Sequence, residues 1–352
     1  MRRKALEGSI YLSIRRAVGI FLSIIGLLFI TRAVGPAAYG LFAAASSLFG
    51  YAQYVGCAGI RAYLIRETRD NSIDIFHQSF TLSCLWGFLV TSISLFILFI
   101  SSTIWKDFYN LALISAWLLM MLLPVAVSEV PMAIIEYRLE YKKISLIELL
   151  AQIMFYIVGI PLAQLGAGVW ALVSAFWVMQ IVSVVGIFWA AEYRPRWEWN
   201  TPQFRTIFKE SLKIGFAQWI YELRQLTTPL VLLPLTNETT VGYYALAERL
   251  RSMLDILRVS IGRLSLPLYA RAKTQPIKLL ELVRLSSLAQ LISVAILYIP
   301  ALFFGEKVLA HLFNEKWDVP LIFLTLAIIG ANQLFFVIFG ALNQALLVVR
   351  QA

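Results

Sequence analysis

Charged side chains recur on one side of a predicted helix that is otherwise largely apolar. They are Glu248, Arg251, Asp255 and Arg258. Spacings of three, four and three residues place them on one helical stripe, and their signs alternate. Ion pairs along the helix, Glu248 with Arg251 and Arg251 with Asp255, would neutralise the stripe. Such a ladder cannot face lipid, so we expect it to line the interface between two halves of the protein.

Two more charges fall deep in an apolar segment. Arg224 lies eleven residues before Leu235, the outer end of its segment. Eleven residues of helix measure about 16 Å, roughly the middle of a bilayer core about 30 Å thick. Glu222 is two residues away and is therefore expected not to face Arg224 but to point toward a cavity or another helix. Arg249, about 100° round its helix from Glu248, falls outside the stripe at a similar depth.

These residue types suit anion binding and ion coupling. The planar guanidinium of arginine offers two parallel donors to phosphate oxygens and keeps its charge at any relevant pH. Arg224 and Arg249, with Arg258 and Arg251, are the candidate ligands of a substrate diphosphate. The acids Glu222, Asp255 and Glu248 are candidates for coupling transport to a proton or Na⁺. The amides of Gln53, Gln180, Asn332 and Gln333 could donate to sugar hydroxyls, although each could equally be a helix–helix contact.

The sequence offers no catalytic or metal-binding pattern. The two histidines, His77 and His311, lie near predicted span ends and lack metal-ligand spacing. Cys57 and Cys84 both lie in apolar blocks, so neither a disulfide nor a metal site is expected. There is no glycine-rich nucleotide loop and no nucleophile elbow. We therefore expect neither an enzyme nor a cofactor.

The composition indicates a membrane protein. Of 352 residues, 60% are hydrophobic and 14% are charged, against about 25% charged in ordinary soluble domains. The net charge of +10 would suggest nucleic acid in a soluble protein, but here the basic residues lie between apolar blocks, so topology explains them and no nucleic-acid partner is expected.

A length of roughly 20 apolar residues per crossing predicts about ten transmembrane helices. They cover residues 9–34, 38–60, 77–104, 111–135, 144–163, 168–191, 211–235, 240–262, 281–304 and 319–342. With the N-terminus inside, sixteen Lys and Arg fall in inside segments and four, at Arg32, Lys106, Lys307 and Lys316, fall outside. The excess of positive charge on one side supports a cytoplasmic N-terminus.

An internal repeat predicts two lobes. Ser9 and Ser211 are offset by 202 residues, as are Gly40 and Gly242 within similar small and aromatic runs. Six predicted helices separate the copies, so the lobes are parallel and enclose a central cavity. We assign residues 1–191 to the first lobe, 192–210 to a cytoplasmic linker and 211–352 to the second. Only four helices fit the second lobe, so two are expected to be missing.

Three runs resemble a known family. They are Leu28–Phe42 (LFITRAVGPAAYGLF), Val241–Leu250 (VGYYALAERL) and Leu266–Arg271 (LPLYAR). They are similar to segments of the polysaccharide and O-antigen flippases, the polysaccharide transport branch of the multidrug/oligosaccharidyl-lipid/polysaccharide superfamily. The resemblance implies an inner-membrane carrier of undecaprenyl-diphosphate-linked oligosaccharide that works by alternating access for surface polysaccharide synthesis, with other polysaccharide assembly proteins as possible partners. Many relatives have an acid where this chain has Thr228.

Rival functions remain open at this point. A cation-coupled multidrug exporter of the same superfamily would favour an aromatic cavity with acids, whereas the deep charges here include arginines. A membrane enzyme of polysaccharide assembly would need an acid/base or His cluster on an outer loop, and only residues 305–318 offer room. A scaffold without transport would carry inert charges in its spans.

Overall fold

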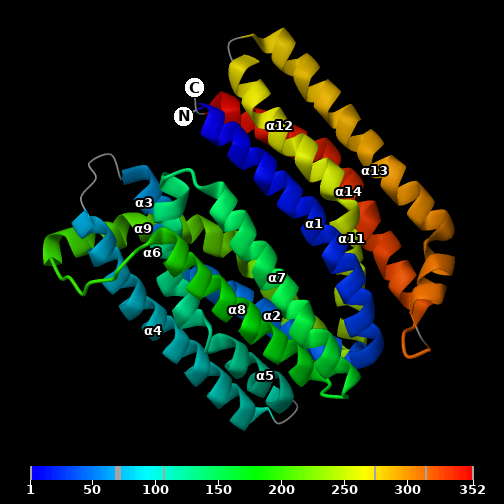
Figure 1. The fold of residues 1–352 in the computed structure, drawn as a ribbon. Helices are drawn as coiled ribbons and strands as arrows, with labels where there is room; N and C mark the ends of the chain where they lie inside the picture. Colours follow the sequence, from blue (N-terminus) through cyan, green and yellow to red (C-terminus); the bar gives the residue numbers. More distant parts are fainter. Residues whose placement is uncertain (1, 68–72, 106–107, 273–274, 314, 351–352) are drawn as a thin grey trace. The chain divides into compact units, whose positions relative to one another are not determined.

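The computed structural model describes residues 2–67, 73–105, 108–272, 275–313 and 315–350, and this part of the chain is helical with no strand (Figure 1). It confirms the all-α architecture. Five helical stretches among these residues are long and apolar enough to cross a membrane: Asp74–Ile104, Tyr109–Tyr137, Tyr141–Gln164, Val169–Ala191 and Ile277–Leu312. Each coincides with a predicted span, while the total of ten crossings stays a prediction. Two of the sixteen inside basic residues, Arg69 and Lys273, and one of the four outside ones, Lys106, lie outside the described residues.

Contacts between helices divide the chain into two units, Met1–Val241 and Gly242–Ala352. The first contains α1 (Arg2–Val34), α2 (Pro36–Cys57), α3 (Ile60–Glu67), α4 (Ile73–Ile104), α5 (Tyr109–Leu119), α6 (Leu122–Tyr137), α7 (Tyr141–Gln164), α8 (Val169–Ala191), α9 (Thr201–Glu222), η2 (Leu223–Leu226), η3 (Thr228–Leu232) and α10 (Leu233–Leu235). The second holds most of α11 (Glu238–Leu254), then α12 (Ile256–Ala272), α13 (Pro276–Leu312) and α14 (Val319–Arg350). Helix α9 thus groups with the first unit, and the lobe boundary at 192–210 stays a prediction.

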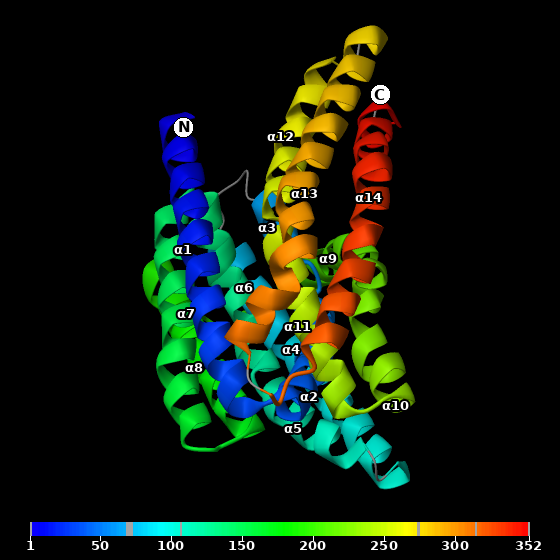
Figure 2. The ribbon, with the colours of Figure 1, turned by 90° about the vertical axis from the view of Figure 1, so that its right-hand side faces the viewer.

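Helix α2 is the centre of the first unit, because it packs against α4, α5, α6, α8 and α9. Ala44 and Ala45 on α2 are fully buried, and small side chains let neighbouring helices approach closely where apolar lipid gives no hydrophobic drive for association. In the second unit, α12, α13 and α14 pack side by side (Figure 2). Their shared core includes Tyr269, Leu279 and Ala345.

Helix starts agree with the internal repeat. Helix α2 begins at Pro36, after Gly35 with φ 82°, and proline suits a first helical turn because that N–H has no helical partner. Helix α11 begins at Glu238, which again gives an offset of 202 residues from Pro36. These two helix starts therefore repeat the offset seen in the sequence.

Three predicted spans depart from one regular helix. The span at 111–135 has a turn at Met120–Met121, and the span at 240–262 has an irregular residue at Asp255, through which helical hydrogen bonds continue. The third is the span predicted at 211–235. Its helix, α9, begins earlier, at Thr201 within the polar stretch 192–210, and ends at Glu222, well before the expected Leu235. Pro229 explains the last break, because proline has no N–H for the helix ladder and its ring displaces the preceding carbonyls. The chain passes through a 3₁₀ turn and a π turn there.

The extended segment after α8 is held against α4. The hydroxyl of Tyr193 donates to the carbonyl of Phe76 at 3.2 Å and lies 3.0 Å from Nδ1 of His77. The backbone N–H of Arg196 donates to the same His77 nitrogen at 3.3 Å. Burial raises the pKa of the Tyr193 phenol, so the ring remains a neutral hydrogen-bonding group. His77 therefore has a structural role in this segment.

A glycine contact positions α9 on α2 and α3. A Cβ at Gly215 would lie 3.0 Å from the backbone of Ala58, and one at Gly59 would lie 2.8 Å from the Ser211 carbonyl. We expect Gly215→Ala to lower the free energy of unfolding by about 1–3 kcal/mol, because backbone cannot yield as a flexible side chain would. Gly340→Ala is the control, since nothing lies within 4 Å of its Cβ. Equal stabilities for the two variants in denaturant titrations of detergent-solubilised protein would contradict this packing.

Candidate functional site

The break at the end of α9 brings Arg224 and Glu222 together. Nε of Arg224 lies 3.7 Å from a carboxylate oxygen of Glu222, and its guanidinium stands 4.4 Å from the ring centroid of Tyr221. The expectation that these two charges do not face each other is therefore wrong, because residues 223–226 form a 3₁₀ turn instead of an α-helix. The Arg224 side chain is 63% exposed and that of Glu222 is 5% exposed.

Glu222 is held by amides. Gln218 donates to one of its oxygens at 3.3 Å, and Gln225 donates to the other at 2.7 Å. A Cβ at Gly50 of α2 would lie 2.4 Å from the Gln225 side chain, so glycine is needed there for Gln225 to pass. The carboxylate is fixed in place, and the arginine beside it is free to meet an outside group through its exposed face.

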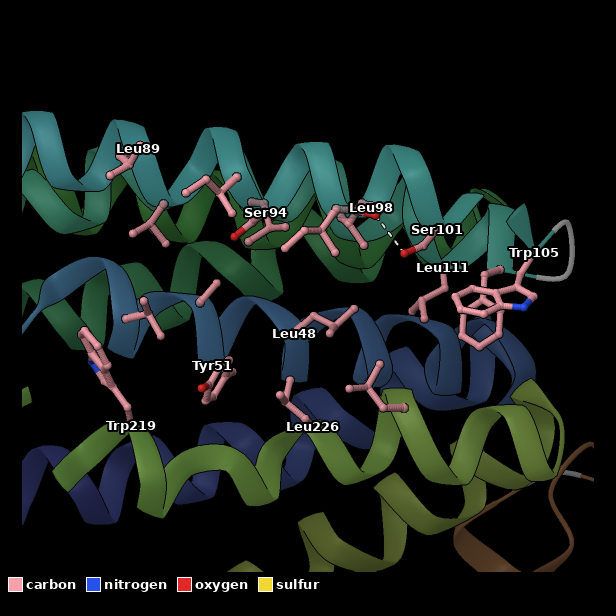
Figure 3. A pocket seen from close by; sticks show the side chains of 18 of the residues that line it. Leu48, Tyr51, Leu89, Ser94, Leu98, Ser101, Trp105, Leu111, Trp219 and Leu226 are labelled. Carbon is pink, nitrogen blue, oxygen red and sulfur yellow. Dashed lines mark hydrogen bonds between the residues drawn. The ribbon is translucent and has the colours of Figure 1, made fainter. Parts of the chain in front are cut away.

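A cavity of about 780 Å³ lies in the first unit between α2, α4, α5 and the broken end of α9 (Figure 3). Helix α4 contributes one stripe at alternating spacings of three and one, namely Trp86, Leu89, Val90, Ile93, Ser94, Ile97, Leu98 and Ser101. From Trp86 to Ser101 the stripe measures about 22 Å. The opposite wall is Trp219, Leu226, Leu230 and Pro234.

The few polar groups of the cavity wall are largely satisfied within the protein. Trp86 donates its indole N–H to the Val55 carbonyl and Trp219 donates to the Tyr54 carbonyl, both at 2.8 Å. Ser101 donates to the Ile97 carbonyl at 2.8 Å. What remains is a long apolar surface that can accept a hydrocarbon chain.

The second unit contains the charge ladder. Arg251 pairs with Glu248 and with Asp255, as the spacing predicts, and Arg258 approaches Asp255 at 3.4 Å. Asp255 is only 4% exposed and stands where α11 ends and α12 begins. Two of the four candidate diphosphate ligands, Arg251 and Arg258, are thus engaged with acids of their own helix pair.

The other predicted residues are scattered. Arg249 is exposed on α11, and Gln53 on α2 and Gln180 on α8 are half-buried. Gln333 is buried on α14, and its Oε1 has no hydrogen-bond partner, whereas Asn332 is exposed. Among the described residues, no group of three or more His, Cys, Asp and Glu is arranged to hold a metal ion.

A half-buried ion cluster in the first unit escaped the sequence reasoning. Nε of Arg61 lies 3.1 Å from Glu129, and Nη1 of Arg61 lies 3.6 Å from Glu136. Arg61 is one of the sixteen basic residues assigned to inside segments, but the chain turns back at Ala58 and Gly59, both with positive φ, and places it in α3 against α6. The i,i+7 spacing of the two acids on an apolar helix was the available signal.

Comparison with known proteins decides the family. The sequence profile described as "Polysaccharide biosynthesis protein" matches residues 29–321. The chain belongs to this family. No curated protein matches it in sequence.

Solved structures show the fold of this polysaccharide biosynthesis family member. It is similar to the lipid II flippase MurJ in an inward closed conformation, with TM-score 0.70 and 13% identity over 98% of this chain and 76% of that chain. An inward-facing multidrug resistance MATE family transporter of the MOP superfamily gives TM-score 0.66 and 16% identity, covering 98% and 84%. An outward-facing one gives 0.59 and 18%, covering 99% and 82%. The chain is a multi-pass membrane protein with the fold of these transporters.

Proposed function

We propose that this protein is a flippase that moves undecaprenyl-diphosphate-linked oligosaccharide units across the bacterial inner membrane by alternating access, with its N-terminus in the cytoplasm. The observation that carries the proposal is the pairing, within one unit, of a long apolar cavity with an exposed arginine at a helix break. A lipid-linked sugar diphosphate has the same two chemistries, a hydrocarbon chain and a compact anion. The family match and the transporter fold support it.

In this proposal Arg224 binds the diphosphate. Its Nε contact with Glu222 is long at 3.7 Å, and its exposed side leaves donors for phosphate oxygens, which arginine meets with two parallel bonds. Arg249 of the second unit is the other exposed candidate. Gln53 and Gln180 are half-buried amides suited to sugar hydroxyls.

The cavity takes part of the hydrocarbon chain. Its α4 stripe runs about 22 Å, and its wall is almost wholly apolar, so it accepts a chain without leaving polar groups unpaired. One wall of the cavity and Arg224 both belong to the segment from α9 to α10. This segment would therefore contact both the hydrocarbon chain and the diphosphate attached to it.

Filling the cavity tests the proposal. Ser94 faces the cavity, whereas Ser92, two residues away on α4, is exposed outside it. We expect Ser94→Trp to lower flipping of a fluorescent polyprenyl-diphosphate sugar in proteoliposomes at least tenfold, because the indole occupies space that the chain needs. Ser92→Trp should flip at the rate of the unchanged protein. Equal rates for both variants would remove the cavity from the transport path. Efflux of ethidium without flipping would favour the multidrug exporter instead.

A further inference from the structure

The Arg61 cluster carries more acid than base. Glu129 and Glu136 share one guanidinium, and their side chains are 12% and 23% exposed. The neighbouring pair of Arg15 on α1 and Glu148 on α7, at 3.1 Å, is internally neutral. Two arginines therefore face three glutamates, and the group holds one excess negative charge when all are ionised.

The excess charge is placed within a membrane-spanning segment. Glu129 lies eight residues before Tyr137, the end of α6, so it is about 12 Å along the helix from that end. Glu136 is one residue from the same end. An ionised carboxylate at depth requires a partner, and ionisable groups inside spans mark ion or proton pathways. A single proton on the acid pair removes the imbalance without a further side chain.

Helix α2 connects this cluster with the break in α9, because it packs against α6, α9 and η2. Cys57 is the last residue of α2. Tyr54, one turn earlier, accepts at its carbonyl from the indole N–H of Trp219 on α9 at 2.8 Å. One helix of the first unit therefore contacts both the acid cluster's helix and the segment that carries the proposed diphosphate ligand.

We propose that the Glu129–Arg61–Glu136 cluster is a binding site for one exchangeable proton and that this proton couples to flipping. The step is simple: a Glu carboxylate oxygen takes a proton from water at the Tyr137 end of α6, and the same O–H bond breaks when the proton leaves. Arg61 stays charged throughout and pairs with the acid that remains ionised. The coupling part of this inference rests on the proposed function, whereas the proton site does not.

Infrared spectroscopy of the purified full chain tests the site directly. Between neutral and acidic pH, we expect the difference spectrum to contain the C=O band of a protonated carboxylic acid of this cluster. Glu129→Gln and Glu136→Gln should each remove that band, because one acid per arginine leaves no excess charge, whereas any band of the more buried Glu222 or Asp255 remains. If one variant fails to fold, the other carries the test. Glu140→Gln is the matched control, because that acid pairs with Lys143 at 2.9 Å and is more exposed.

Each outcome has a defined meaning. A difference spectrum in which neither variant loses a carboxylic acid band overturns the proton site, whatever the protein transports. If the site is correct and couples to flipping, an imposed pH gradient should change the flipping rate of the fluorescent polyprenyl-diphosphate sugar in proteoliposomes at least tenfold. In Glu129→Gln the same gradient should leave the flipping rate unchanged. A band that behaves as expected, in a protein that flips nothing, keeps the proton site and refutes the proposed function.

Discussion

Replacing Arg251 by leucine is expected to lower the free energy of unfolding of the second unit by about 3 kcal/mol, near the lower end for breaking a buried ion pair. Arg251 contacts both Glu248 and Asp255, and Asp255 is 4% exposed. Without Arg251 the carboxylate keeps only Arg258, at 3.4 Å. The desolvation cost of Asp255 then has much less to offset it.

Trp317 reports this loss within the second unit. It is the single tryptophan of Gly242–Ala352 and is buried, with Tyr243 and Phe313 against it. Fluorotryptophan labelling would let its resonance be followed through an SDS titration of the detergent-solubilised protein. Arg284→Leu, which removes an exposed cation of α13, should change the unfolding free energy by no more than about 0.5 kcal/mol. A loss below about 1 kcal/mol in Arg251→Leu would show that the ladder contributes little.

Arg224→Ala is expected to weaken binding of a short-chain polyprenyl diphosphate by roughly ten- to a hundredfold, the loss that accompanies removal of hydrogen bonds to a charged group, about 1.5–3 kcal/mol. Arg224→Lys should retain part of the affinity, because lysine keeps the charge but lacks the planar fork. Stability should hardly change, since the side chain is 63% exposed.

Calorimetric titration of the unchanged protein, Arg224→Ala and Arg224→Lys measures their affinity for the polyprenyl diphosphate. Complementation of cells that lack their own flippase, at equal expression, measures the effect on surface polysaccharide. Tyr221→Leu separates the ring contact from the charge, because the guanidinium stands over that ring at 4.4 Å. Wild-type affinity and full surface polysaccharide in Arg224→Ala would exclude this arginine as the diphosphate ligand.

Hydropathy predicts where this fold has helices, because a crossing needs an uninterrupted apolar run whatever its neighbours are. It does not predict where a helix bends. Pro229 was visible in the sequence, yet its consequence, a 3₁₀ turn that joins Arg224 to Glu222, depends on how the freed backbone groups are satisfied. Asp255 likewise marks the division between α11 and α12 only once its partners are known.

The candidate site divides in the same way. The ladder from Glu248 to Asp255 follows from helical spacing alone, since its partners are local in sequence. The pairing of Arg61 with Glu129 joins residues 68 positions apart, and it depends on the reversal at Ala58 and Gly59. Positive φ at Ala58 is unusual for a residue with a Cβ, so no local preference announces it. Long-range packing decides such contacts.

Helix α13 fixes where the bilayer must lie on the second unit. Its 37 residues measure about 55 Å, far more than the hydrocarbon thickness of about 30 Å. The uncharged stretch between Arg284 and Glu306 measures roughly 31 Å at the helical rise, which matches that thickness. The first two turns, with Lys278 and Glu281, therefore stand in the headgroup layer or in water. In a thicker membrane, the charged residues that flank this stretch would have to enter the hydrocarbon, or the lipid would have to deform around the helix, so a hydrocarbon layer of about 30 Å suits this helix best.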